Sequence, residues 1–131
     1  MNHIPSPDTS DAGIERLIQT KGKTAPRITP ADIEANIDGE YYFTAAQGVQ
    51  AAMGEQDELT RLTGFHGDLH LLTFCVLHLQ NGFTVTGESA CVSPENFDAE
   101  IGRKIARQNA VEKIWPLLGF SLKQKLHEAA K

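Results

Sequence analysis

The dipeptide Asn81-Gly82 is the feature that most constrains what this chain folds into. It separates two runs of β-favouring and apolar residues, 71–79 and 83–89. Asn-Gly between such runs is the strongest short-range signal for a β-hairpin, because a two-residue type I′ turn needs positive φ at both positions. The sequence therefore predicts an antiparallel hairpin in the second half of the chain.

A two-residue turn also predicts the register of this hairpin, with His78 opposite Val85. The first strand is apolar on both faces, and a lone hairpin is marginal in water, so helices must cover it. Both outer edges are unpaired in this arrangement, and we expect a second copy of the chain to pair with one of them, giving a homodimer. The predicted faces are Phe74, Val76, Phe83 and Val85 on one side, and Cys75, Leu77, Leu79, Thr84 and Thr86 on the other.

A long helix is predicted to follow the hairpin and to cover it. Ser93 is the expected N-cap, and Pro94 suits the first helical position. Phe97, Ile101 and Ile105 recur every four residues and so share one helix face. We expect this apolar stripe to pack on the hairpin and to form the centre of the core.

The long helix is expected to end or kink near Ile114, because the residue before Pro116 avoids the α region. A last amphipathic helix is predicted over 121–130. The polar residues 55–68, which precede the hairpin, predict a loop.

Three short helices are predicted nearer the N-terminus, over 12–21, 30–37 and 45–53. Thr29 is followed three residues later by Asp32, which is the pattern of a capping box at the start of the second helix. A Thr-x-x-Gln sequence predicts the same arrangement at the start of the third helix.

These elements predict an α+β fold, in which a central antiparallel hairpin is packed by a long C-terminal helix and accompanied by short N-terminal helices. The length of 131 residues suits one domain. We expect that domain to span residues 11–131 after a flexible N-terminus at 1–10. The hairpin and long helix, 71–118, form its core.

Composition excludes several classes of protein. No apolar run approaches the roughly 18–20 residues of a membrane span, and the polar start is unlike a signal peptide. Two cysteines cannot form a disulfide scaffold, so we expect a cytoplasmic protein. The 11 glycines form neither a Walker nor a Rossmann pattern, so we expect no nucleotide cofactor, and no other cofactor is indicated.

Charge is distributed unevenly along the chain. Residues 28–68 hold eight acidic residues and one basic residue, whereas residues 103–131 hold seven basic and two acidic residues. These two segments are suited to dock on one another, within one chain or between subunits. Exposed ion pairs are each worth about 0–1 kcal/mol, so they orient the segments more than they stabilise the fold.

Part of the C-terminal half matches a known pattern. In order along the chain come 83–90 (FTVTGESA), 96–98 (NFD), the small residues Gly102, Ala106 and Ala110, and 114–117 (IWPL). With these motifs, residues 73–122 resemble the uncharacterised gene-forty-nine/gene-sixty-six family of small tailed-bacteriophage proteins. The resemblance implies a phage or prophage origin and no particular reaction. An accessory role in the host cell, such as modifying host physiology or blocking host defence, is the corresponding expectation.

Two surfaces are candidates for binding a macromolecule. The basic face of the 97–115 helix, with Arg103, Lys104 and Arg107, suits nucleic acid, although an acidic chain with a pI near 5.5 disfavours that partner. Tyr41 and Tyr42, which lie among acidic residues, suit contact with a basic protein, because tyrosine offers a large area at low entropic cost.

Chemistry at cysteine or histidine is less well supported. In the predicted hairpin His78 and Cys75 point to opposite faces, and no Cys-x-x-Cys occurs, so we expect no metal site. Cys91 ends a Gly-x-Ser-x-Cys sequence that begins at Gly87. Its thiolate would be favoured if Cys91 lay beside the N-terminus of a helix capped at Ser93. The simpler interpretation is that Gly87 permits close backbone approach and that Cys91 packs as a small apolar residue.

We therefore expect a non-enzymatic phage protein, without catalytic residues, that binds a host or phage protein inside the cell. A nucleic-acid-binding protein is the first alternative. A small-ligand-binding protein or a thiol enzyme at Cys91 is the second.

Overall fold

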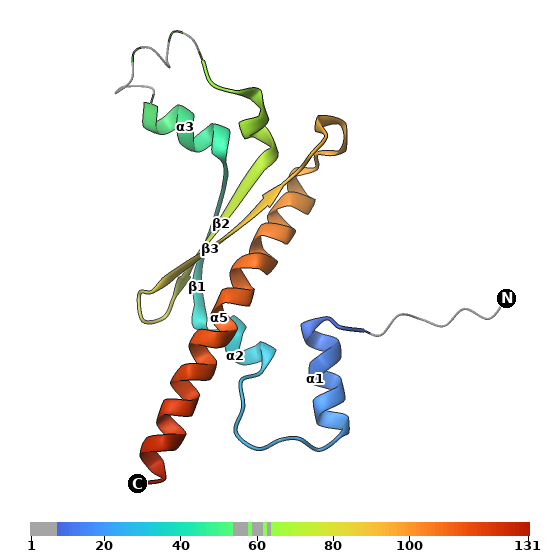
Figure 1. Cartoon of the computed structure of the whole chain (residues 1–131), viewed down its shortest axis with the longest axis vertical. Coiled ribbons are helices and arrows are strands. Elements are labelled where there is room, and N and C mark those ends of the chain that lie inside the picture. Colours follow the sequence, from blue (N-terminus) through green and yellow to red (C-terminus); the bar gives the residue numbers. More distant parts are fainter. Residues whose placement is uncertain (1–7, 54–57, 59–61, 63) are drawn as a thin grey trace, which may run out of the picture.

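A computed structural model of the chain describes residues 8–53, 58, 62 and 64–131. A three-stranded antiparallel sheet lies against the long helix α5, and short helices lie at both ends of the sheet (Figure 1). The predicted α+β fold is therefore confirmed. The elements in chain order are α1 (Asp11–Thr20), α2 (Pro30–Asn36), β1 (Ile37–Thr44), α3 (Ala45–Met53), η1 (Gly67–Leu71), β2 (Leu72–Leu79), β3 (Thr84–Ala90), η2 (Pro94–Asn96) and α5 (Ala99–Ala129).

The short helices begin where their N-caps predict. The Thr29 hydroxyl accepts from the Asp32 backbone N–H, and the Asp32 carboxylate accepts from the Thr29 N–H. Thr44 and Gln47 make the same reciprocal pair at the start of α3. Half of the loop predicted over 55–68 lies outside the described residues, and its last two residues, Gly67 and Asp68, begin η1.

The sheet has a third strand that the sequence analysis did not predict. β1 pairs with β2 from Ile37 opposite Leu79 to Thr44 opposite Thr73, so β2 is the central strand. One edge of the hairpin is thus covered by the same chain, and the open edges belong to β1 and β3. The homodimer stays a prediction, although one of the two edges that motivated it is occupied.

The predicted hairpin register is wrong by one residue. Val85 lies opposite Leu77 rather than His78. The loop has three residues, because the Leu79 N–H donates to the Phe83 carbonyl at 2.8 Å. Within this loop, Gly82 alone has positive φ, at 91°, so the turn needs one left-handed residue and not two. Val85 therefore joins Leu77 on the buried face, and Phe83 does not share a face with Val76.

α5 packs on the sheet through its small residues. A Cβ atom on Gly87 of β3 would lie 2.1 Å from the Ala106 carbonyl oxygen and 2.3 Å from the Ala110 nitrogen, so glycine allows the two backbones to approach. The predicted packing of the Phe97, Ile101 and Ile105 stripe on the hairpin is wrong, since Ile101 is 56% and Ile105 44% exposed. The helix face that contacts the sheet is made of Gly102, Ala106, Ala110 and Ile114.

The predicted ends of the long helix are also wrong. Ser93 precedes the short η2, and Asp98 caps α5 by accepting from the Ile101 N–H at 3.1 Å. Pro116 lies inside α5, which continues to Ala129 as one helix instead of two. Proline leaves the carbonyl four residues earlier without its usual donor, and here that residue, Glu112, is exposed, so water can serve instead.

α1 is attached to the rest of the fold by polar contacts at its two sides. The Arg27 guanidinium donates two hydrogen bonds to Glu15, and the Trp115 indole donates to Asp11 at 3.3 Å. No residue of α1 is buried. Within the described residues, no helix is both long and apolar enough to cross a membrane.

Candidate interaction surfaces

The two faces of the sheet differ sharply in burial. Along β2, Thr73, Cys75, Leu77 and Leu79 are buried beneath α5, whereas the alternating residues are only half-buried. Within the described residues, the second face has no helix across its middle (Figure 1). We call this second face the open face, and its members are Asp38, Tyr41, Phe43, Leu72, Phe74, Val76, His78, Thr84, Thr86 and Glu88.

Aromatic side chains dominate one part of the open face. The Phe43 and Phe74 rings lie opposite one another on β1 and β2, with centroids 5.5 Å apart. Tyr41 lies opposite Val76 in the next row and is 61% exposed. α3 reaches the end of this surface, where a Cβ on Gly48 would meet the Phe43 ring at 3.4 Å. Tyr41, a candidate from the sequence, is therefore part of a wider apolar surface.

One polar pair lies on the same face. The Asp38 carboxylate hydrogen-bonds Nδ1 of His78, across the irregular pairing at the start of β1. His78 and the buried Cys75 point to opposite faces, as the sequence predicts. Among the described residues, no three His, Cys, Asp or Glu side chains are grouped so that they could hold a metal ion.

The second candidate tyrosine, Tyr42, lies on the helix-covered face and is half-buried. Burial, together with the neighbouring Cys75 and Glu40, raises the pKa of Tyr42 to about 12. The Tyr42 hydroxyl donates to the Glu40 carboxylate at 3.2 Å. Tyr42 thus packs against the core beneath α5, unlike Tyr41.

The three candidate basic residues of α5 have different surroundings. Arg107 donates to Glu34 on α2 and to Glu40 on β1, so the docking of acidic and basic segments predicted from the charge pattern occurs within the chain. Lys104 is 3.2 Å from Glu100 on the same helix. For Arg103, no ion pair is found in the described part of the chain.

Cys91 is half-buried between β3 and η2, and its thiol donates to the Ser93 carbonyl at 3.2 Å. It lines a small cavity of about 140 Å³ with Phe97 and Ile101. The expected helix N-terminus at Ser93 is only a three-residue turn, and α5 begins six residues further on, at Ala99. The activation of Cys91 by a helix dipole therefore has no structural basis.

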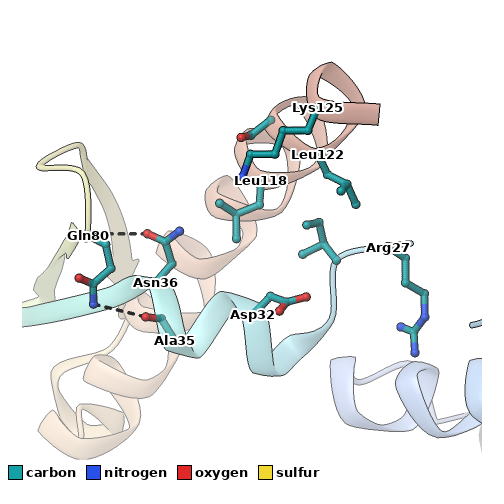
Figure 2. Close-up of a pocket in the computed structure, with 10 residues that line it drawn as sticks. Arg27, Asp32, Ala35, Asn36, Gln80, Leu118, Leu122 and Lys125 are labelled. Atoms are coloured by element: carbon teal, nitrogen blue, oxygen red, sulfur yellow. Dashed lines mark hydrogen bonds between the residues drawn. The ribbon is translucent and has the colours of Figure 1, made fainter. Parts of the chain in front are cut away.

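A pocket of about 420 Å³ lies between α2 and the C-terminal half of α5 (Figure 2). Leu118 and Leu122 provide its apolar side, and Lys125 reaches over it. Gln80 closes one end by hydrogen-bonding Asn36 and the Ala35 carbonyl. The sequence leaves a small-ligand-binding protein as an alternative, and binding of a small ligand in this pocket stays an untested alternative.

The fold defines a class of small α+β protein in which a long helix covers one face of a three-stranded sheet and leaves the other face open. Residues 28–126 match the profile described as the phage protein (N4 Gp49/phage Sf6 gene 66) family, and the chain belongs to this family. α1 precedes the matched region. No curated protein and no solved structure matches the chain significantly.

Proposed function

We propose that this phage protein is a non-enzymatic accessory protein that binds a host or phage protein through the open face. The observation that carries the proposal is the set of apolar side chains on a sheet face that no helix among the described residues covers. Tyr41 is 61% exposed, Phe43 is 39% exposed, and Phe74 and Val76 lie beside them. We further propose that it acts in the cytoplasm of the bacterial host.

Physical chemistry supports this interpretation of the open face. A sheet with one face against water usually alternates apolar and polar residues, but here the central strand β2 is apolar on both faces. Contiguous apolar surface is costly to hydrate, and clusters rich in aromatic residues mark protein interfaces. Tyr41 combines a large exposed ring with a hydroxyl, as residues at the centre of interfaces often do.

Site-specific photocrosslinking tests the proposal. Benzoylphenylalanine is placed at position 41, and a matched control carries it at position 120, where Phe120 is 75% exposed on α5 away from the sheet. Both proteins are expressed during infection and irradiated in the cell. We expect one discrete adduct with a phage or host protein from position 41 and none of that mass from position 120. The same adducts from both positions, or none from position 41, would overturn the proposal.

A further inference from the structure

Charged groups on the open face occupy two diagonal corners. Three rows cross the sheet on this side: Phe43, Phe74 and Glu88; then Tyr41, Val76 and Thr86; then Gly39, His78 and Thr84. Glu88 is exposed at the β3 corner of the first row, and Asp38 lies beside the third row on β1. The apolar side chains fill the area between these two carboxylates.

The sheet contains no positive counterpart to these carboxylates. β1, β2 and β3 include neither lysine nor arginine, and their only basic side chain is that of His78, which Asp38 already binds. Glu88 therefore has no cation within the sheet, whereas Asp38 contacts His78 through one oxygen and has only its second oxygen left for a cation from outside. A nucleic acid, which is a polyanion, is the wrong partner for such a surface.

The spacing of the two corners fixes the geometry of a complementary partner. Asp38 and Glu88 are two strands and about four residues apart, which gives a diagonal of about 17 Å from standard strand spacings. In an α-helix, residues eleven positions apart lie on one face and are separated by about 16.5 Å. The positions four and seven residues after the first of them lie on that face too, above the centre of the diagonal.

We infer that the open face binds an amphipathic helix of its partner protein that carries basic residues eleven positions apart and apolar residues between them. The inference rests on the proposed function and names the chemistry of the partner. The basic residues face Asp38 and Glu88, and the apolar residues cover Tyr41, Phe74 and Val76. The partner helix would then cover the open face as α5 covers the opposite one.

A second copy of this chain is the competing occupant, because α5 itself exposes Ile101 and Ile105 beside Arg103 and Lys104. Arg103 and Lys104 are adjacent and lie within one helical turn, so they cannot reach both Asp38 and Glu88 at the two ends of the diagonal. We therefore favour a different protein, and self-association becomes one outcome of the test.

The test uses two synthetic 18-residue helical peptides with the same apolar stripe. One carries lysine and the other glutamate at two positions eleven apart, and binding to the full chain is followed by fluorescence anisotropy. We expect the lysine peptide to bind and the glutamate peptide not to bind. Glu88→Lys should weaken binding of the lysine peptide about fivefold, because an exposed ion pair is worth up to about 1 kcal/mol and the substitution also places two like charges together. The control Glu112→Lys changes the same charge on the far side of α5 and should have no effect.

Each other outcome decides a separate question. The two peptides could bind equally well, with Glu88→Lys having no effect and Tyr41→Asp abolishing binding. This result would overturn the inference that the partner is basic, but it would keep the open face as the binding surface. Binding of neither peptide overturns the inference, while the crosslinking result still decides the proposed function. Concentration-dependent dimerisation that Glu88→Lys removes would replace the partner helix by a second copy. Circular dichroism of each variant confirms that it is folded.

Discussion

The Arg107 guanidinium connects α5 to both α2 and β1, because it donates to Glu34 at 2.8 and 3.0 Å and to Glu40 at 2.8 Å. These hydrogen bonds lower the pKa of Glu34 and raise the pKa of Arg107. Arg107 is 27% exposed, so the network is partly screened by water but retains its geometry. It is the contact through which the acidic segment of the chain docks on the basic one.

Replacing this arginine should therefore destabilise the fold. We expect Arg107→Ala to lower the free energy of unfolding by about 1–2 kcal/mol, since it removes charge-assisted hydrogen bonds and leaves two carboxylates facing each other. Urea denaturation measures the change. The matched control is Arg103→Ala, which should stay within about 0.5 kcal/mol of the original protein. Equal effects of both substitutions would contradict a structural role for Arg107.

Gly87→Ala should be among the most destabilising single substitutions. Its Cβ would lie 2.1 Å from the Ala106 carbonyl oxygen, and both clashing groups are backbone atoms that cannot rotate away. We expect a loss of about 3 kcal/mol or failure to fold, as for severe overpacking. Gly119→Ala is the control: its Cβ meets no atom within 4 Å, and alanine should stabilise α5 by up to about 1 kcal/mol. Thermal unfolding of the two variants in parallel should give shifts of opposite sign.

The sequence predicts the features that depend on neighbouring residues and fails for those that depend on residues far apart in the chain. Capping at Thr29 and at Thr44 depends on residues three positions apart, and both helices begin where predicted. The sequence does not predict strand β1, because the pairing that stabilises the strand involves residues about 30 to 40 positions away. The size of Ile101 and Ile105 dominates the apolar pattern of α5 and predicts the wrong contact face, whereas Gly87 decides which face approaches the sheet.

The candidate site was predictable only in part. Tyr41 was identified from its acidic neighbours and its residue type, and the structure places it on the open face. The pairing of Tyr41 with Val76, and of Phe43 with Phe74, requires the register of a strand that the sequence did not predict. The diagonal from Asp38 to Glu88 requires both registers at once.

Acid should release α1 before it unfolds the sheet. The hydrogen bonds from Arg27 lower the pKa of Glu15 to about 2, from an ordinary value of 4.5. A lowered carboxyl pKa gives stability that is present above the ordinary value and is lost as pH falls through the folded value. We therefore expect hydrogen exchange in α1 to accelerate between about pH 4.5 and 2 relative to β2. Glu15→Gln should abolish this pH step, and its persistence in that variant would assign the release to another group.

Tyr42 should ionise late and make the fold sensitive to alkali. Burial raises its pKa to about 12, above an ordinary value of 10.0. The unfolded chain therefore loses this proton first, and stability falls as pH rises from about 10 to 12. Absorbance at the tyrosinate band should show a phase near pH 12, which Tyr42→Phe removes. If the late phase survives in Tyr42→Phe, another tyrosine is responsible for it and the assignment to Tyr42 is wrong.

Nucleic acid should not be retained by this protein at physiological salt. Of the three basic residues proposed for that role, Arg107 is engaged by Glu34 and Glu40, and Lys104 is near Glu100. Counterion release from a phosphate backbone needs several free cations, and the net charge of −5 opposes approach. A filter-binding assay with DNA and RNA at low and high salt measures retention. The contrary result would be salt-sensitive retention that Arg103→Glu abolishes and the control Lys113→Glu does not. It would establish the basic face of α5 as a nucleic-acid site.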